Sequence, residues 1–244
     1  MNPVLEEIIS TGNTRTISGG IKKVIGQISP EEGKLIQDCI NKTGAEISVE
    51  VGLAFGTSAL YICDALFKSD KTRHYVIDPY QMYEDSYSGI GLNNLKKAGY
   101  ENIVDFIDKP SHQALAELER KNVKADFAFI DGWHTFDHAL VDFFLIDKLL
   151  RIDGIVILDD SDWKAVRKVC SFISNNRAYK FIGGTSKRSY INENVHRSGL
   201  KKYFNRMKNF FKGYVDDEQK RFGAMAFQKV SGDDRRWDHF VDFS

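Results

Sequence analysis

Residues 47–66 read ISVEVGLAFGTSALYICDAL, and this stretch decides the fold class. Its first five residues place a β-branched side chain at every second position, which is typical of a short buried strand. Small residues follow, with glycine at positions 52 and 56, and residues 57–67 then carry apolar side chains at helical spacing. A strand, a glycine turn and a helix in direct succession predict the start of a βαβ unit.

The same alternation continues along the chain. Ser29, Pro30 and Glu32 predict the start of a helix over residues 30–42, because serine caps a helix, proline suits its first turn and glutamate completes the capping box. Later strands are predicted at residues 74–78, 103–107, 125–131, 154–160, 179–184 and 223–230, with helices over residues 88–98, 112–121, 136–150 and 162–175. The last two strands lack a crossover helix of the earlier kind. The prediction is a doubly wound, mostly parallel α/β sheet of seven strands with an antiparallel last strand.

Three parts are expected along the chain. Residues 1–43 are predicted to form an N-terminal helical cap or lid, residues 44–232 the main domain, and residues 233–244 a C-terminal tail. The main domain contains a basic insertion at residues 185–220 with an amphipathic helix, in which residues 185–214 carry eight Lys or Arg side chains against one Glu. That helix could pack on its own domain, form a homodimer contact or substrate lid, or bind an anionic membrane surface. A lid of this charge would suit an anionic acceptor.

Composition excludes several classes of protein. The chain has 244 residues, with 34 basic and 34 acidic side chains and 42% hydrophobic residues, as in an ordinary globular domain. The balanced charge argues against a nucleic-acid partner, and no apolar run is long enough for stable membrane insertion. The acidic N-terminus does not resemble a secretory signal, so a cytoplasmic location is expected. Cys39, Cys63 and Cys170 are odd in number and far apart, which favours buried inert thiols.

Polar residues gather where the predicted strands end. In a doubly wound sheet the ligand crevice lies at this edge, so these residues are the candidate site. Asp78 ends the strand that follows the glycine turn, where a carboxylate can accept both hydroxyls of a ribose. Its alternative role is a turn residue or helix cap. The turn lacks the Gly-x-Gly-x-x-Gly spacing of nicotinamide dehydrogenases, and the combination indicates an adenosine-type ligand.

Three carboxylates are expected to converge at the same edge. Asp131 ends one strand, and Asp159 and Asp160 end the next strand along the chain. Acids at this density repel one another unless a cation is bound, and an oxygen-only set suits a hard divalent ion such as magnesium. The alternative is that Asp159 and Asp160 only cap the following helix.

These motifs together resemble class I S-adenosylmethionine-dependent methyltransferases, and most closely the metal-dependent small-molecule O-methyltransferases of the catechol, sugar and macrolide-tailoring types. The motifs are EVGLAFGTS at residues 50–58, VIDP at 76–79, FIDGWH at 129–134 and LLRIDGIVILDD at 149–160. The resemblance covers roughly residues 30–184 and the closing strand pair. Ala54 stands where most of the wider superfamily has glycine, although the catechol-like branch often lacks that glycine too.

The resemblance implies a role for each site residue. It places the methionine end of S-adenosylmethionine near Glu50 and the glycine turn, the ribose at Asp78, and the adenine near Ser111 and His112, although Ser111 could equally be a helix N-cap. The implied cofactor-binding residues are Glu50, Gly52, Gly56, Thr57, Ser58, Asp78, Ser111, His112 and Asp131. The implied metal ligands are Asp131, Asp159 and Asp160, with the metal binding both oxygens of a diol-like acceptor.

His134, three residues after Asp131, is a candidate general base because imidazole titrates near neutrality. Asp131 or the metal could instead assist deprotonation, while His138 and Asp142 are expected to lie behind the site or in solvent. The expected function is therefore metal-assisted methyl transfer to a hydroxyl of a small molecule, of sugar or natural-product type. The alternatives are a metal-dependent hydroxylase or hydrolase on the same fold, and a non-catalytic cofactor-binding protein.

Overall fold

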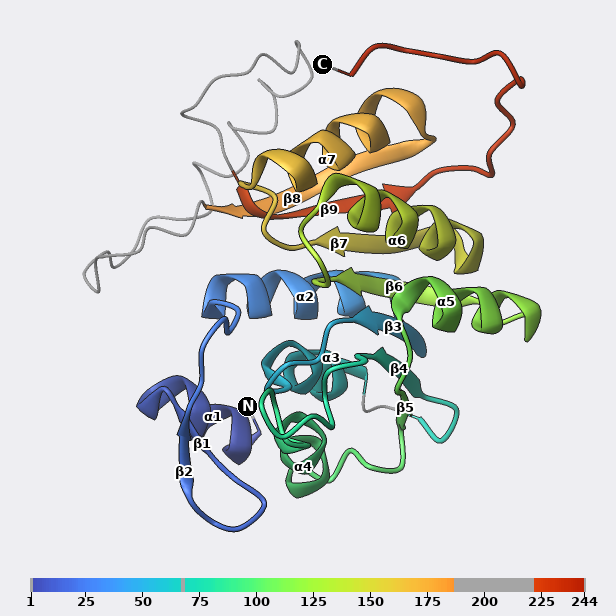
Figure 1. The fold of residues 1–244 in the computed structure, drawn as a ribbon. Coiled ribbons are helices and arrows are strands. Elements are labelled where there is room, and N and C mark those ends of the chain that lie inside the picture. Colours follow the sequence, from blue (N-terminus) through green and yellow to red (C-terminus); the bar gives the residue numbers. More distant parts are fainter. Residues whose placement is uncertain (1, 67–68, 187–221, 244) are drawn as a thin grey trace.

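The computed structural model describes residues 2–66, 69–186 and 222–243 (Figure 1). Its centre is a seven-stranded sheet with the strand order β5-β4-β3-β6-β7-β9-β8. The strands are β3 (Ile47–Val51), β4 (Arg73–Ile77), β5 (Val104–Ile107), β6 (Ala125–Ile130), β7 (Leu150–Leu158), β8 (Tyr179–Ser186) and β9 (Phe222–Lys229). Only β9 runs against its neighbours, β7 and β8. The predicted sheet, including its antiparallel last strand, is confirmed.

Helices cover both faces of the sheet (Figure 1). They are α1 (Pro3–Thr11), α2 (Pro30–Thr43), α3 (Thr57–Leu66), α4 (Ile90–Lys97), α5 (Ser111–Arg120), α6 (Phe136–Leu149) and α7 (Lys164–Asn176). The first four contribute to one apolar core and the last three to another, on opposite faces of the strands. In β6, for example, Phe127 and Phe129 face the first core while Ala128 and Ile130 face the second. This alternation explains why the central strands read as continuous apolar runs.

The predicted start of α2 is confirmed in detail. The Ser29 hydroxyl accepts a hydrogen bond from the backbone N–H of Glu32, and the Glu32 carboxylate accepts one of 2.6 Å from the backbone N–H of Ser29. Gly44, in the left-handed conformation, ends the helix. The chain therefore enters β3 directly from a well-defined helix end.

The N-terminal part is less helical than predicted. After α1, two three-residue strands, β1 (Asn13–Arg15) and β2 (Ile21–Lys23), form an antiparallel hairpin. All three residues of β2 are exposed, so this hairpin carries no alternation of apolar and polar residues from which a strand could be predicted. The segment that follows, residues 24–28, lies against the glycine turn after β3.

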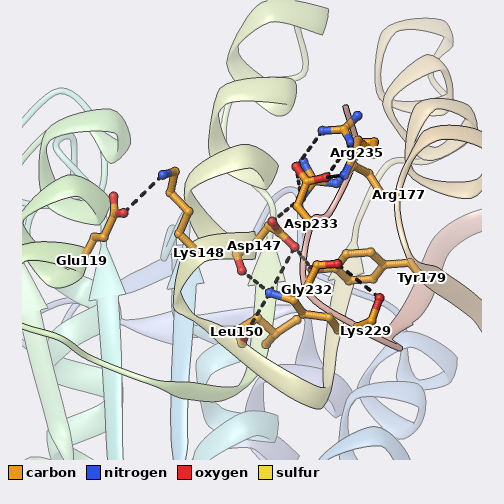
Figure 2. Close-up of polar contacts among 11 residues, drawn as sticks. Glu119, Asp147, Lys148, Leu150, Arg177, Tyr179, Lys229, Gly232, Asp233 and Arg235 are labelled. Carbon is orange, nitrogen blue, oxygen red and sulfur yellow. Dashed lines mark hydrogen bonds and ion pairs between the residues drawn. The ribbon is translucent and has the colours of Figure 1, made fainter. Parts of the chain in front are cut away.

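A buried ionic cluster joins the end of α6 to the closing strands (Figure 2). Asp147 forms an ion pair with Arg177 and accepts a hydrogen bond of 2.6 Å from the Tyr179 hydroxyl. Lys229 lies 3.3 Å from the Asp147 carboxylate and donates to the backbone carbonyl of Leu150 at 3.0 Å. Burial, followed by the charge of Asp147, raises the pKa of Tyr179. These contacts fix the point where α6 passes into β7.

The C-terminal tail docks on the same region. Asp233 lies 3.2 Å from Arg177, and Asn176 exchanges two hydrogen bonds with the backbone of Val241. The Arg235 guanidinium, which donates to Asp233, lowers the pKa of that carboxyl to about 2. The tail therefore covers the end of α7.

Other expectations have different outcomes. The basic insertion predicted at residues 185–220 falls almost wholly within residues 187–221, and its amphipathic helix lies outside the described residues. Cys39, Cys63 and Cys170 are buried and free, and burial raises the pKa of the first and third thiols to about 12. Among the described residues, no helix is both long and apolar enough to cross a membrane.

Candidate functional site

The glycine turn after β3 lies where the strand order reverses, between β3 and β6. Gly52 has a φ of 92°, and a Cβ placed there would lie 2.1 Å from the backbone oxygen of Asp131. Only glycine satisfies both the left-handed backbone and this close approach. Asp131 N–H in turn donates to the Val51 carbonyl at 2.9 Å, so the two strand ends are joined at the switch point.

Asp78 ties the same turn to the end of β4. One carboxylate oxygen accepts hydrogen bonds from the backbone N–H groups of Leu53 at 3.1 Å and Ala54 at 3.0 Å. The other oxygen accepts from the N–H of Tyr80 at 2.8 Å. Asp78 therefore acts as a turn residue, as in the alternative prediction, because it accepts three backbone hydrogen bonds. The oxygen that accepts from Tyr80 retains a second lone pair, and Asp78 also lines the cavity described next, so binding of a ribose hydroxyl stays compatible with these contacts.

Ala54 adopts a left-handed conformation with φ of 47°, which is unfavourable for a residue with a Cβ. We expect Ala54→Gly to raise the free energy of unfolding by up to about 1 kcal/mol, since relief of strain outweighs the added unfolded-state entropy. The matched control is Ala59→Gly in α3, where a buried helical alanine is lost and stability should fall by about 1 kcal/mol or more. Urea denaturation of both variants measures the difference, and equal destabilisation would contradict the prediction.

A cavity of about 730 Å³ opens at the carboxyl ends of β3, β4, β5 and β6. It brings together five of the predicted cofactor-binding residues, namely Gly52, Asp78, Ser111, His112 and Asp131. Tyr80, Tyr83, Tyr87 and Trp133 form its aromatic walls. Burial, followed by the negative charges of Asp78 and Asp131, raises the pKa of Tyr87. The volume and the mixture of aromatic and polar walls suit a nucleoside-sized ligand.

A smaller pocket, of about 30 Å³, lies on the other side of the turn. Thr57 and Ser58 line it together with Gly52 and Asp131, and residues 24–28 of the N-terminal part close it. The N-terminal part was predicted to be a helical cap, but residues 24–28, which lie next to the glycine turn, form neither helix nor strand. Its contribution to the site could not be recognised from sequence because it carries no motif.

Glu50 and Gly56 line neither cavity. The Glu50 carboxylate is fully buried, 2.9 Å from Nε2 of His74, whose Nδ1 lies 2.8 Å from the Ser48 hydroxyl. Side chains alternate along a strand, so Glu50 points away from the face that carries Val49 and Val51. Contact between Glu50 and a cofactor stays a prediction, and the burial of Glu50 beside His74 does not favour it. Gly56, with a φ of 81°, ends the turn and approaches Gly91.

The carboxylate cluster differs from the predicted set in one member. Single ligand atoms of Asp131, His134 and Asp160 all lie within 4.8 Å of one another. Asp159 is not part of this group, because consecutive residues at a strand end point in different directions and Asp160 turns the chain with φ of 50°. The three half-buried groups offer two carboxylates and one imidazole, a set that fits a divalent cation such as Mg²⁺ or Mn²⁺.

His134 connects the cluster to the mouth of the site. Its Nε2 lies 3.2 Å from a carboxylate oxygen of Asp160, and its ring centroid lies 5.2 Å from that of Trp163. The Trp163 side chain is exposed beside it. A polar group of a ligand bound here would meet His134 and the two carboxylates together.

Sequence reasoning underestimated two features of the large cavity. Asp142 was expected behind the site or in solvent, but its side chain is 2% exposed and lines the cavity. The three tyrosines of residues 80–87 were not singled out, although their position directly after the Asp78 strand end is a usable signal. Asp142 carries no comparable signal, because its position depends on how α6 packs against α5.

Residues 49–161 match the sequence model of a family described as "Methyltransferase domain". This stretch, a little under half of the chain, is therefore similar to a methyltransferase domain. The matched residues contain the glycine turn, Asp78 and all members of the carboxylate cluster, whereas residues 24–28 and Trp163 lie outside the match.

Curated relatives match over a little more than half of the chain. A probable caffeoyl-CoA O-methyltransferase from Arabidopsis thaliana is 32% identical over 143 residues, which are 55% of this chain and 56% of the relative. Tricin synthase 2 from Oryza sativa subsp. japonica is 33% identical over 141 residues, 55% of this chain and 44% of the relative. The chain thus aligns with about half the length of the curated relatives it matches.

Solved structures share the fold over most of the chain. An O-methyltransferase from Bacillus cereus, in complex with SAH, has a TM-score of 0.64 at 17% identity and covers 94% of this chain and 92% of its own. TomG from Streptomyces achromogenes, an O-methyltransferase in complex with SAM, has a TM-score of 0.56 at 17% identity, with coverage of 84% and 82%.

Proposed function

We propose that this chain transfers a methyl group from S-adenosylmethionine to a hydroxyl of a small diol-like molecule, with help from a divalent cation. The observation that carries the proposal is that Asp131 belongs to two sites at once. It lines the nucleoside-sized cavity and is a member of the carboxylate cluster. A cofactor in the cavity and an acceptor at the cluster would therefore meet beside one residue.

In this proposal Asp78 binds the ribose hydroxyls, and Gly52 allows the cofactor to approach the backbone of the turn. Asp131 and Asp160 would hold the cation, which when bound favours the ionised form of an acceptor hydroxyl. His134 takes the proton of that hydroxyl, since the adjacent Asp160 carboxylate stabilises the imidazolium that forms. The protein's remaining task is to align the acceptor oxygen with the methyl group.

The names of the relatives support this class of acceptor. The plant relatives are named for caffeoyl-CoA and tricin, and the solved neighbour TomG is described as acting in tomaymycin synthesis. We propose that the acceptor of this chain also carries adjacent oxygens that a cation can bind, whether phenolic or of sugar type.

The cofactor half of the proposal can be tested without knowing the acceptor. We expect S-adenosylhomocysteine to bind the protein in a calorimetric titration, and Asp78→Asn to weaken the affinity by roughly 10- to 100-fold, because the amide cannot accept at both positions. Asp85→Asn, an exposed acid beyond the same strand, is the matched control and should bind as the wild type does. Absence of any binding to the wild-type protein would refute the proposed function.

A further inference from the structure

The glycine turn after β3 is held in place by side chains from outside it. The Asp78 carboxylate accepts from two of its backbone N–H groups, and two buried amides donate to its carbonyl groups. The Ala54 carbonyl accepts a hydrogen bond of 2.8 Å from Nε2 of Gln81, and the Phe55 carbonyl accepts one of 3.0 Å from Nδ2 of Asn94. The conformation of the turn therefore depends on residues from the loop after β4 and from α4.

Gln81 uses both polar atoms of its side chain in this arrangement. Its Oε1 accepts a hydrogen bond of 3.0 Å from the backbone N–H of Gly91, the second residue of α4, and its backbone carbonyl accepts one of 2.7 Å from Gly89. The reverse orientation of the amide would place acceptor against acceptor at Ala54 and donor against donor at Gly91. The side chain is fully buried, so Gln81 links the turn to the start of α4 in one fixed geometry.

Ala54 is the strained residue of the turn, since its φ of 47° is unfavourable for a residue with a Cβ. Its N–H donates to Asp78 and its carbonyl accepts from Gln81, so both of its backbone polar groups are fixed by the segment after β4. Ala54 lines the large cavity and the smaller pocket, whereas Gln81 lines neither. Gln81 therefore acts on a ligand through the conformation of Ala54.

We propose that Gln81 is a positioning residue for cofactor binding, because its amide holds Ala54 in the left-handed conformation in which the turn forms a wall of both pockets. The inference rests on the proposed function, since the ligand is the same S-adenosyl cofactor. A turn that already has its bound shape does not have to be ordered by the ligand, so binding loses less conformational entropy. Without the Gln81 amide, the ligand would have to restore the strained conformation itself.

The first test measures binding of S-adenosylhomocysteine by calorimetric titration. Gln81→Met keeps the length of the side chain and removes both of its hydrogen bonds, and we expect the affinity to fall roughly tenfold. Gln37→Met is the matched control. Gln37 in α2 also donates from a partly buried amide, to Asp64 at 3.2 Å, but it lines neither pocket, so this variant should bind as the wild type does.

A second substitution distinguishes positioning of the turn from a general loss of stability. Glycine adopts the left-handed conformation without the penalty that alanine has, so Ala54→Gly replaces part of what the Gln81 amide supplies. We expect Ala54→Gly to tighten binding several-fold more in the Gln81→Met background than in the wild-type background. If Gln81 only stabilised the fold, Gln81→Met would lower the thermal unfolding temperature without this coupling. Equal effects of Ala54→Gly in the two backgrounds would overturn the inference.

The outcomes separate this inference from the proposed function. If the wild-type protein does not bind S-adenosylhomocysteine, the proposed function fails and this inference fails with it. If the wild-type protein and a folded Gln81→Met variant bind it equally well, only the role of Gln81 is wrong. Should thermal unfolding show that Gln81→Met is not folded, Gln81→Asn replaces it, because the shorter amide cannot reach both partners. Wild-type affinity in Gln81→Asn would then contradict the role of Gln81.

Discussion

Asp131→Asn is expected to remove the heat of magnesium binding and to lower the rate of methyl transfer by about 10²- to 10³-fold. An asparagine keeps the size and the backbone contacts of Asp131 beside Gly52, but it removes one of the two negative charges that would hold the cation. Calorimetry with magnesium chloride measures the first effect. Transfer of a labelled methyl group to a panel of phenolic and sugar diols measures the second.

Two further variants make this result specific. His134→Gln should keep the magnesium heat while losing turnover, since in the proposed mechanism His134 moves a proton and the carboxylates hold the cation. Loss of the magnesium heat in His134→Gln would instead identify the imidazole as a ligand. Asp137→Asn is the matched control, because its side chain is 77% exposed near the site and lies outside the cluster. An unchanged magnesium heat in Asp131→Asn would reject the proposed metal site.

Asp147→Leu is expected to lower the free energy of unfolding by about 3–5 kcal/mol. The substitution leaves the Lys229 cation buried without a carboxylate partner and Arg177 with Asp233 alone, and Tyr179 loses its hydrogen-bond acceptor (Figure 2). Uncompensated buried charge is among the most costly defects in a folded protein. Urea denaturation followed by circular dichroism measures the loss, and Asp147→Asn provides a milder variant if the leucine variant does not fold.

The same helix offers a matched control. Lys148, the next residue, forms an ion pair of 3.3 Å with Glu119, and each side chain is 40% exposed (Figure 2). Breaking this pair with Glu119→Gln should cost less than about 1 kcal/mol, because solvent screens exposed charges. Similar losses from Asp147→Leu and Glu119→Gln would show that the buried cluster contributes no more than a surface pair.

Most of the secondary structure could be predicted from sequence for simple reasons. Strands covered on both faces are short apolar runs, and Gly44 and Pro79 interrupt the pattern at their ends. The β1–β2 hairpin was missed because its strands have three residues and β2 is exposed. A segment this short and exposed shows no alternation of apolar and polar residues, so its conformation depends on how it packs against the rest of the protein.

Sequence predicted the edge of the sheet at which the candidate site lies. Asp78, Asp131 and Asp160 end strands, and parallel strands end on one edge, so their convergence could be expected before the structure was known. Which of these carboxylates lie close together could not be predicted, because this depends on the direction of the backbone after the end of β7. There Asp160 turns toward His134, and Asp159 is left outside the group.

The seven strands, the glycine turn and the edge on which the chemistry-bearing residues lie follow from local sequence, because they depend on the period of the apolar residues and on the residues that end each strand. The strand order, which places the backbone of Asp131 against Gly52, depends instead on contacts between segments distant in the chain. Such contacts also bury Glu50 beside His74 and place Asp142 and Ser111 in the wall of one cavity. The direction of a side chain follows from the contacts of its element with others distant in the chain, and local sequence does not contain those contacts.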